Sequence, residues 1–180
     1  LYKVGDRSSD NKCEDQFEYH LRAKSIFCCG CHMIRSEAFL DVNPNREIFP
    51  AKRGQNWQML LPVYYKYKRG FLDECLYNYI IYKSSMSSLD TSKEERVRRF
   101  NEHYEIIENT LYRINMSNYE REKYLKIFYN ICIVDIFDVS IIYTDIKLAL
   151  KQYFKMVKYR LLRKNDTKSL VKIIINSLIN

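Results

Sequence analysis

The sequence is poor in glycine. Only four glycines and three prolines occur among its 180 residues. A Gly-rich phosphate loop places several glycines close together, so that the backbone can approach the phosphate oxygens. The four glycines of this chain are widely separated. A nucleotide-binding loop of that kind is therefore excluded within this sequence.

The sequence also lacks a long apolar run. A spanning helix needs about 18 or more predominantly apolar residues, and Asp135, Asp138 and Asp145 interrupt the most apolar stretches. Nothing resembles a secretory signal peptide. The chain starts with Leu1 and a polar run, and we expect the native N-terminus to lie elsewhere.

Cysteine is present in a pattern that does not indicate a secreted framework. Three of the six cysteines fall in "CCGC", where they cannot all pair locally, which favours reduced thiols in a cytoplasmic protein. Cys28, Cys29, Cys31 and His32 are zinc-ligand types, but structural zinc needs two spaced ligand pairs. Consecutive side chains of a strand point to opposite faces. We therefore expect buried cysteines in a core strand and no bound metal.

Positive charge is concentrated at the C-terminal end. Nine of the 30 basic residues and one of the 22 acidic residues lie between residues 147 and 180, so this segment carries the entire excess of +8. Lys147, Lys151, Lys155 and Lys158 recur at helical spacing on one face. Such a face can contact an anionic membrane surface or nucleic acid phosphates, or it can simply be solvated. We predict membrane contact and do not expect nucleic acid as a partner.

The first half of the chain predicts mixed α/β structure. "SIFCCGCHMI" is typical of a strand with a bulge at Gly30, and a second strand is predicted from Leu76 to Tyr82. "RSEAFLDV" predicts a short helix capped by Ser36. A further helix opens at Gly54, and Pro62 should kink or end it.

The second half predicts four helices. Ser92 followed by Glu95 is a capping-box pattern, and the next helix should be capped at Ser117 or Asn118. "TDIKLALKQYFKMVKYRLLRK" and "TKSLVKIIINSLI" predict the third and fourth helices. The predicted fold class is α+β, mostly α.

Two blocks in the first half resemble a known family. "SIFCCGCHMIRSEAFL" and "GQNWQMLLPVYYKYKRGFLDECLYNYIIYKSSMSS" resemble the acceptor-side half of bacterial family 2 glycosyltransferases with the GT-A fold. The resemblance covers about a third of the chain and lies closest to a subgroup that decorates surface polysaccharides. It implies that residues 1–89 are the C-terminal fragment of a GT-A-like domain and that residues 90–180 are a helical extension.

The resemblance also implies a reaction. A nucleotide-sugar donor, held through a divalent cation (Mg²⁺ or Mn²⁺) by an aspartate motif, gives its sugar to a glycan or lipid-linked acceptor. That donor half and its aspartate motif are not visible in this sequence. We therefore expect the chain alone to bind no cofactor and to be inactive. The parent enzyme would act in the cytoplasm, at the inner membrane face.

The resemblance assigns roles to individual residues. Gly30 falls in the segment that borders the acceptor pocket. Gln55 and Asn56 occupy the pair that is Glu-Asp in many relatives, where the aspartate is the general base. An amide cannot ionise, but it can orient sugar hydroxyls. The nearest carboxylates that could replace the base are Asp73 and Glu74, whose alternative role is a solvated turn.

A second group of assignments lies further along the matched block. Tyr82 and Met86 replace an arginine and a histidine of the family, and methionine is a poor ligand for a hard cation. Ser85 and Ser87 remain as partners for phosphate oxygens. Trp57, Tyr64, Tyr65 and Tyr67 could stack on a sugar ring, although helical spacing favours core packing for Trp57.

The sequence therefore leaves three possible functions open. The first is the acceptor-side part of a glycosyltransferase. The second is a non-catalytic carbohydrate-binding or assembly module derived from one, which the loss of the acidic pair favours. The third is a basic helical nucleic-acid binder, for which a steep fall of affinity with salt would argue.

Overall fold

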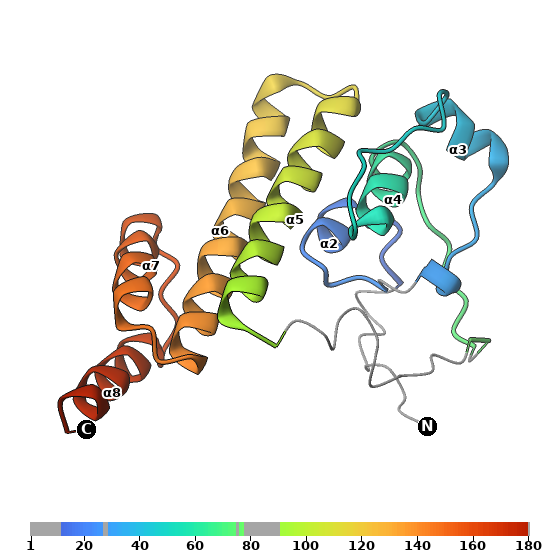
Figure 1. Cartoon of the computed structure of the whole chain (residues 1–180). Coiled ribbons are helices and arrows are strands. Elements are labelled where there is room, and N and C mark those ends of the chain that lie inside the picture. The colour runs from blue at the N-terminus through green and yellow to red at the C-terminus, as the bar shows by residue number, and fades with distance from the viewer. Residues whose placement is uncertain (1–11, 27–28, 75, 78–90, 180) are drawn as a thin grey trace. The chain divides into compact units, whose positions relative to one another are not determined.

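The computed structural model describes residues 12–26, 29–74, 76–77 and 91–179 (Figure 1). Their elements, in chain order, are α2 (Phe17–Leu21), the 3₁₀ helix η1 (Cys29–Cys31), α3 (Ser36–Val42), α4 (Gln55–Lys66), α5 (Lys93–Arg113), α6 (Asn118–Ile142), α7 (Ile146–Tyr159) and α8 (Asp166–Ile179). The chain divides into two compact units. Unit 1 comprises Leu1–Ile80 and Glu105–Leu125, and unit 2 comprises Ile81–Tyr104 and Lys126–Asn180.

The predicted α+β fold is wrong. The described residues form helices and turns, with no strand or sheet among them. Residues 29–31, which were expected in the first strand, form η1 instead. Of the second predicted strand, Leu76 and Tyr77 have no strand structure, and residues 78–82 lie outside the described ranges. A short apolar run is ambiguous by periodicity alone, and strand propensity depends on a neighbouring strand to pair with. The expectation of a GT-A-like sheet in residues 1–89 is corrected accordingly. The predicted boundary at 89/90 itself falls outside the described residues.

The core of unit 1 is built where α2 packs against α4. Leu21 and Leu61 are fully buried there, and the C-terminal half of α5 adds Ile107 and Leu111. Trp57 is 5% exposed, and its indole Nε1 donates a hydrogen bond to the His20 carbonyl at 3.0 Å. Trp57 therefore joins two helices of the core, as its helical spacing predicted.

Helix α4 continues through Pro62 to Lys66, so Pro62 does not end it. A proline has no N–H to donate to the carbonyl four residues earlier, which here is the carbonyl of Gln58. The Arg113 guanidinium reaches that carbonyl at 3.4 Å. The Gln58 side chain, fully buried, meanwhile bonds both the N–H (2.6 Å) and the carbonyl (3.0 Å) of Phe49. The Arg113 bond therefore supplies a donor to the carbonyl that the proline leaves unpaired, and the Gln58 side chain ties the start of α4 to the loop before it.

Side chains cap the starts of α5, α6 and α7. The Ser92 Oγ accepts from the Glu95 N–H at 3.2 Å while the Glu95 carboxylate accepts from the Ser92 N–H at 3.1 Å, which confirms the predicted capping box. Ser117 and Glu120 repeat the arrangement before α6. Asp145 caps α7 by accepting from the Leu148 N–H. Ser36, in contrast, is the first residue of α3 and not its cap, which is Arg35.

The core of unit 2 lies where α6, α7 and α8 meet (Figure 1). Its buried side chains come in pairs from the three helices: Ile133 and Phe137, Ala149 and Met156, and Leu170 and Ile173. The turn between α7 and α8 is held by the Arg163 guanidinium, which bonds the carboxylates of Asp138 and Asp166. This helical packing confirms the four helices predicted for the second half.

Candidate functional site

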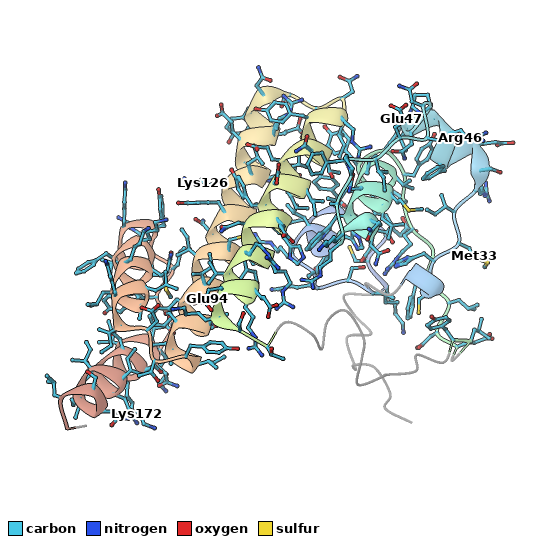
Figure 2. All side chains as sticks on the ribbon, viewed as in Figure 1. Met33, Arg46, Glu47, Glu94, Lys126 and Lys172 are labelled. Carbon is cyan, nitrogen blue, oxygen red and sulfur yellow. The ribbon has the colours of Figure 1, made fainter. Side chains whose placement is uncertain are left out.

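Unit 1 contains a cavity of about 470 Å³ between the η1–α3 segment and the C-terminal half of α4. We call it the unit 1 pocket. Its lining residues are Cys31, His32, Met33, Ile34, Arg35, Ala38, Leu60, Val63, Tyr64, Tyr67, Lys68, Arg69 and Gly70. Met33, 98% exposed, projects from the rim into solvent (Figure 2). The volume falls in the range of small-molecule sites.

A chain of hydrogen bonds fixes the polar wall of the unit 1 pocket. The Ile26 carbonyl lies 2.9 Å from the His32 Nε2, and a carbonyl can only accept, so Nε2 carries the proton. The His32 Nδ1 is then an acceptor, and the Tyr64 hydroxyl donates to it at 3.1 Å. Burial lowers the pKa of His32 and raises the pKa of Tyr64. Both side chains are therefore neutral and held in one orientation.

A second histidine lies behind this wall. His20 is fully buried, with its ring 5.2 Å from the Tyr64 ring and 6.1 Å from the His32 ring. Burial, together with the proximity of His32, lowers the pKa of His20 to about 3. The neutral His20 ring thus forms an uncharged backing for Tyr64 and His32.

The charged groups of the unit 1 pocket are cations. Arg35, Lys68 and Arg69 line it, and no acidic residue is among the described lining residues. The Arg69 guanidinium also donates to the Ser25 hydroxyl at 3.2 Å, and Lys68 pairs with Glu14 at 3.2 Å. The pocket can therefore donate hydrogen bonds to hydroxyl, carboxylate or phosphate oxygens.

Tyr67 offers the pocket an aromatic face. Its ring is half-buried in the lining, and its hydroxyl donates to the Asp41 Oδ2 at 2.8 Å. Lys66 bonds the same carboxylate oxygen at 2.5 Å. A ring held in this way suits stacking on the apolar C–H face of a sugar.

The amide pair that the sequence singled out lies at the start of α4, outside the pocket lining. The Gln55 side chain is exposed and donates to the Ala51 carbonyl at 3.1 Å, while Asn56 is half-buried. Trp57 is a core residue with no face open to a sugar. The structure therefore does not bring these three residues together with the pocket.

The other predicted residues are scattered. Asp73 and Glu74 are exposed and do not line the pocket, so their role as base stays a prediction. Gly30 is in η1, where an added Cβ would lie 2.3 Å from the Tyr77 ring. Tyr82, Ser85, Met86 and Ser87 lie outside the described residues.

The four predicted membrane-binding lysines all lie on α7. Lys147, Lys151 and Lys158 are exposed and Lys155 is half-buried. Phe154 and Val157 are 67% and 49% exposed on the same helix. Within the described ranges, no helix combines the length and the apolar character needed to cross a membrane.

The residues of the unit 1 pocket do not fit a divalent cation. Such ions prefer carboxylate and carbonyl oxygens, whereas the charged side chains here are guanidinium and ammonium groups. Across the described part of the chain, no cluster of three or more His, Cys, Asp or Glu side chains could hold a metal.

The sequence pointed to some pocket residues and missed others. Tyr64 and Tyr67 were predicted to contact a sugar, but Arg35 and Arg69 were not singled out, and His32 was considered only as a zinc ligand. The signal that could have found Arg69 is the run "YYKYKRG", which interleaves aromatic and basic residues directly after an apolar helix face. A comparison of the chain with protein-family models, curated proteins and solved structures finds no match.

Proposed function

We propose that this chain forms the acceptor-binding part of a glycosyltransferase, and that the unit 1 pocket holds the acceptor. The observation that carries the proposal is the composition of the pocket. Its lining residues all fall within 31–38 and 60–70, and these two ranges lie in the two sequence blocks that resemble glycosyltransferases. The pocket combines an aromatic ring, neutral hydrogen-bonding groups and cations, the groups with which proteins hold polar and acidic sugars.

In the proposed reaction a sugar passes from a nucleotide-sugar donor to a hydroxyl of a glycan or lipid-linked acceptor. Tyr67 would stack on the acceptor ring, and Tyr64, Arg69 and Arg35 would orient its hydroxyl or acidic groups. The donor and its divalent cation would be held by the part of the enzyme that precedes the matched blocks in the family. The hydroxyl must lose a proton, and Asp73 or Glu74 is proposed to receive it.

Sugar transfer by the native protein, isolated from its source, tests this proposal. The purified protein is incubated with nucleotide-sugars and with oligosaccharides released from the source's surface polysaccharide. We expect a donor-dependent product, and we expect Tyr67→Ala to weaken acceptor use by about tenfold, the equivalent of one aromatic stacking contact. Tyr119→Ala changes an 80% exposed tyrosine of unit 1 outside the pocket and serves as the matched control.

A second candidate is a carbohydrate-binding module that does not catalyse transfer. It is favoured by the absence of acidic residues among the described lining residues of the pocket, since transfer needs a proton acceptor near the incoming hydroxyl. Saturable oligosaccharide binding by the native protein, with no product from any nucleotide-sugar, would support this candidate. Donor-dependent product would exclude it.

We further propose that unit 2 contacts the anionic cytoplasmic face of the inner membrane. The exposed lysines of α7 lie beside exposed apolar side chains, Phe154 and Val157, and this pairing suits a helix lying in the lipid interface. Binding to phosphatidylglycerol vesicles should fall as salt screens the lysines. Phe154→Ser should weaken it, whereas Phe154→Leu should not. Equal binding to neutral phosphatidylcholine vesicles would contradict the proposal.

A further inference from the structure

Unit 2 contains a second cavity, of about 320 Å³, between the N-terminal half of α5, the middle of α6 and α7. We call it the unit 2 pocket. Its lining residues are Val97, Asn101, Tyr104, Tyr129, Cys132, Ile133, Ile136, Leu148, Lys151, Gln152 and Lys155. It lies outside the segment that resembles glycosyltransferases, and no sequence pattern pointed to it.

The unit 2 pocket has a cationic edge. Lys151 is exposed and Lys155 is half-buried, and the Lys155 Nζ donates to the Tyr129 hydroxyl at 3.1 Å. Neither lysine forms an ion pair with any described residue, and no acidic residue is among the described lining residues. Two ammonium groups without counter-charge attract an anion. Lysine binds phosphate as a point charge.

The wall of the unit 2 pocket contains a hydrogen-bond acceptor that has no donor among the described residues. Gln152 is 5% exposed, and its buried Oε1 makes no hydrogen bond within the described part of the chain. A buried polar atom left unsatisfied costs free energy, so its retention beside a cavity indicates a ligand group that donates to it. A ligand hydroxyl is such a group. Ile133, Ile136 and Leu148 complete a wall that C–H groups can contact.

These observations lead to one ligand chemistry. We propose that the unit 2 pocket binds a phosphate ester that carries a free hydroxyl, with the phosphate at Lys151 and Lys155 and the hydroxyl donating to Gln152. The ester can be a soluble polyol phosphate or the headgroup of a phospholipid such as phosphatidylglycerol. This site is independent of the acceptor pocket in unit 1.

The test titrates the full chain with glycerol 3-phosphate, using methyl phosphate, which lacks a free hydroxyl, as the comparison ligand. Calorimetry should show saturable binding of glycerol 3-phosphate. Lys155→Gln should weaken it by about tenfold or more, as expected for a hydrogen bond to a charged group. Lys147→Gln and Lys158→Gln remove the same charge from the same helix at positions outside the pocket lining and should leave affinity within about twofold, because they lie beyond hydrogen-bond reach.

The Gln152→Leu variant tests the hydroxyl contact separately. It should weaken glycerol 3-phosphate binding and leave methyl phosphate binding unchanged, since only the former can donate to Oε1. If this variant does not fold, side-chain amide NMR of the unaltered chain replaces it. The Gln152 and Asn101 amide signals must then shift with glycerol 3-phosphate. No saturable binding, or equal losses from all three lysine variants, would overturn the proposal.

Vesicles distinguish the two sources of the ester. Gln152→Leu changes no charge, so it leaves general attraction to an anionic surface intact. Weaker binding of this variant to phosphatidylglycerol vesicles assigns the pocket to the lipid headgroup. Unchanged vesicle binding, together with the loss of glycerol 3-phosphate binding, assigns it to a soluble ester.

Discussion

At the scale of the residue, Gly54 shows how one backbone position fixes the start of a helix. It precedes α4 with φ at +77°, a left-handed conformation that costs a non-glycine residue about 1 kcal/mol or more. A Cβ at this position would also lie 2.9 Å from the Ile106 side chain. Both the left-handed backbone and the close approach arise because the chain enters α4 directly beside the buried face of α5.

Replacing Gly54 by alanine should therefore destabilise unit 1 by about 1–3 kcal/mol. Urea unfolding followed by the fluorescence of Trp57, the single tryptophan, measures this free energy. Gly70→Ala is the control, because a Cβ at residue 70 meets nothing within 4 Å. Equal midpoints for the two variants would show that the α4 entry is not strained by a side chain.

Asp135 gives unit 2 a pH dependence. Burial, with a contribution from Asp138, raises the pKa of Asp135 to about 6. The unfolded carboxyl titrates near 4, so the folded state binds the proton more tightly. The stability that this group contributes is present below about pH 4 and is lost as the pH rises through about 6.

Asp135→Asn should accordingly stabilise the protein at pH 8 by about 1 kcal/mol, a value reduced for partial exposure of the carboxyl. At pH 5, midway between the unfolded and the folded pKa, the difference should fall to about half of its value at pH 8. Urea unfolding followed by circular dichroism at the two pH values measures it. A variant less stable than the parent at pH 8 would show that Asp135 is held there as a favourable carboxylate by Arg163 and Arg99.

At the scale of the element, helix starts were predictable and strands were not. The capping boxes at Ser92 and Ser117 depend on residues three apart in the sequence, so local pattern is sufficient to find them. A strand exists only with a pairing partner, which local pattern cannot supply, and the apolar run around Cys29 forms η1 instead. The continuation of α4 through Pro62 depends in the same way on a distant residue, Arg113.

Ser117→Ala should destabilise the protein by about 1 kcal/mol. The Ser117 hydroxyl accepts from the Glu120 N–H and donates to its carboxylate at 2.7 Å, and alanine removes both bonds from the start of α6. Thermal or urea unfolding measures the loss. Ser177→Ala, which removes an exposed bond to the Ile174 carbonyl in α8, is expected to stay within about 0.5 kcal/mol.

The candidate site shows the same limit, which is that local sequence pattern does not reveal contacts between distant residues. The sequence indicated aromatic residues at 64 and 67, because they fall in a distinctive block. It could not show that His32, about thirty residues earlier, hydrogen-bonds to Tyr64. Nor could it show that Gln55 bonds its own preceding turn and so lies apart from the pocket. The position of each residue relative to the pocket depends on contacts that residue type alone does not show.

At the scale of the whole molecule, unit 1 should be sensitive to acid. The pKa of His20 is lowered to about 3 by burial, whereas an unfolded histidine titrates near 6.5. The unfolded state therefore binds more protons between these values. The stability that His20 contributes is present above about pH 6.5 and is lost as the pH falls toward 3.

Unfolding reported by Trp57 should show this loss, because its indole bonds the His20 carbonyl. The urea midpoint should fall between pH 7 and pH 4, and His20→Phe should flatten that slope. His103→Gln changes a histidine in the residues of unit 2 and should preserve the slope. A midpoint that does not move with pH in the unaltered chain would mean that the folded state binds the His20 proton as tightly as the unfolded state does.

The measurement that tests the central proposal most directly is oligosaccharide binding by this chain, followed by NMR. Oligosaccharides from the source's surface polysaccharide should shift the signals of His32, Tyr67 and Arg69 in a saturable way. Tyr67→Ala should weaken binding by about tenfold, and Tyr119→Ala should not. Saturable shifts confined to the unit 1 pocket are the result that the proposal predicts. Shifts elsewhere, or no binding at millimolar oligosaccharide, would contradict it.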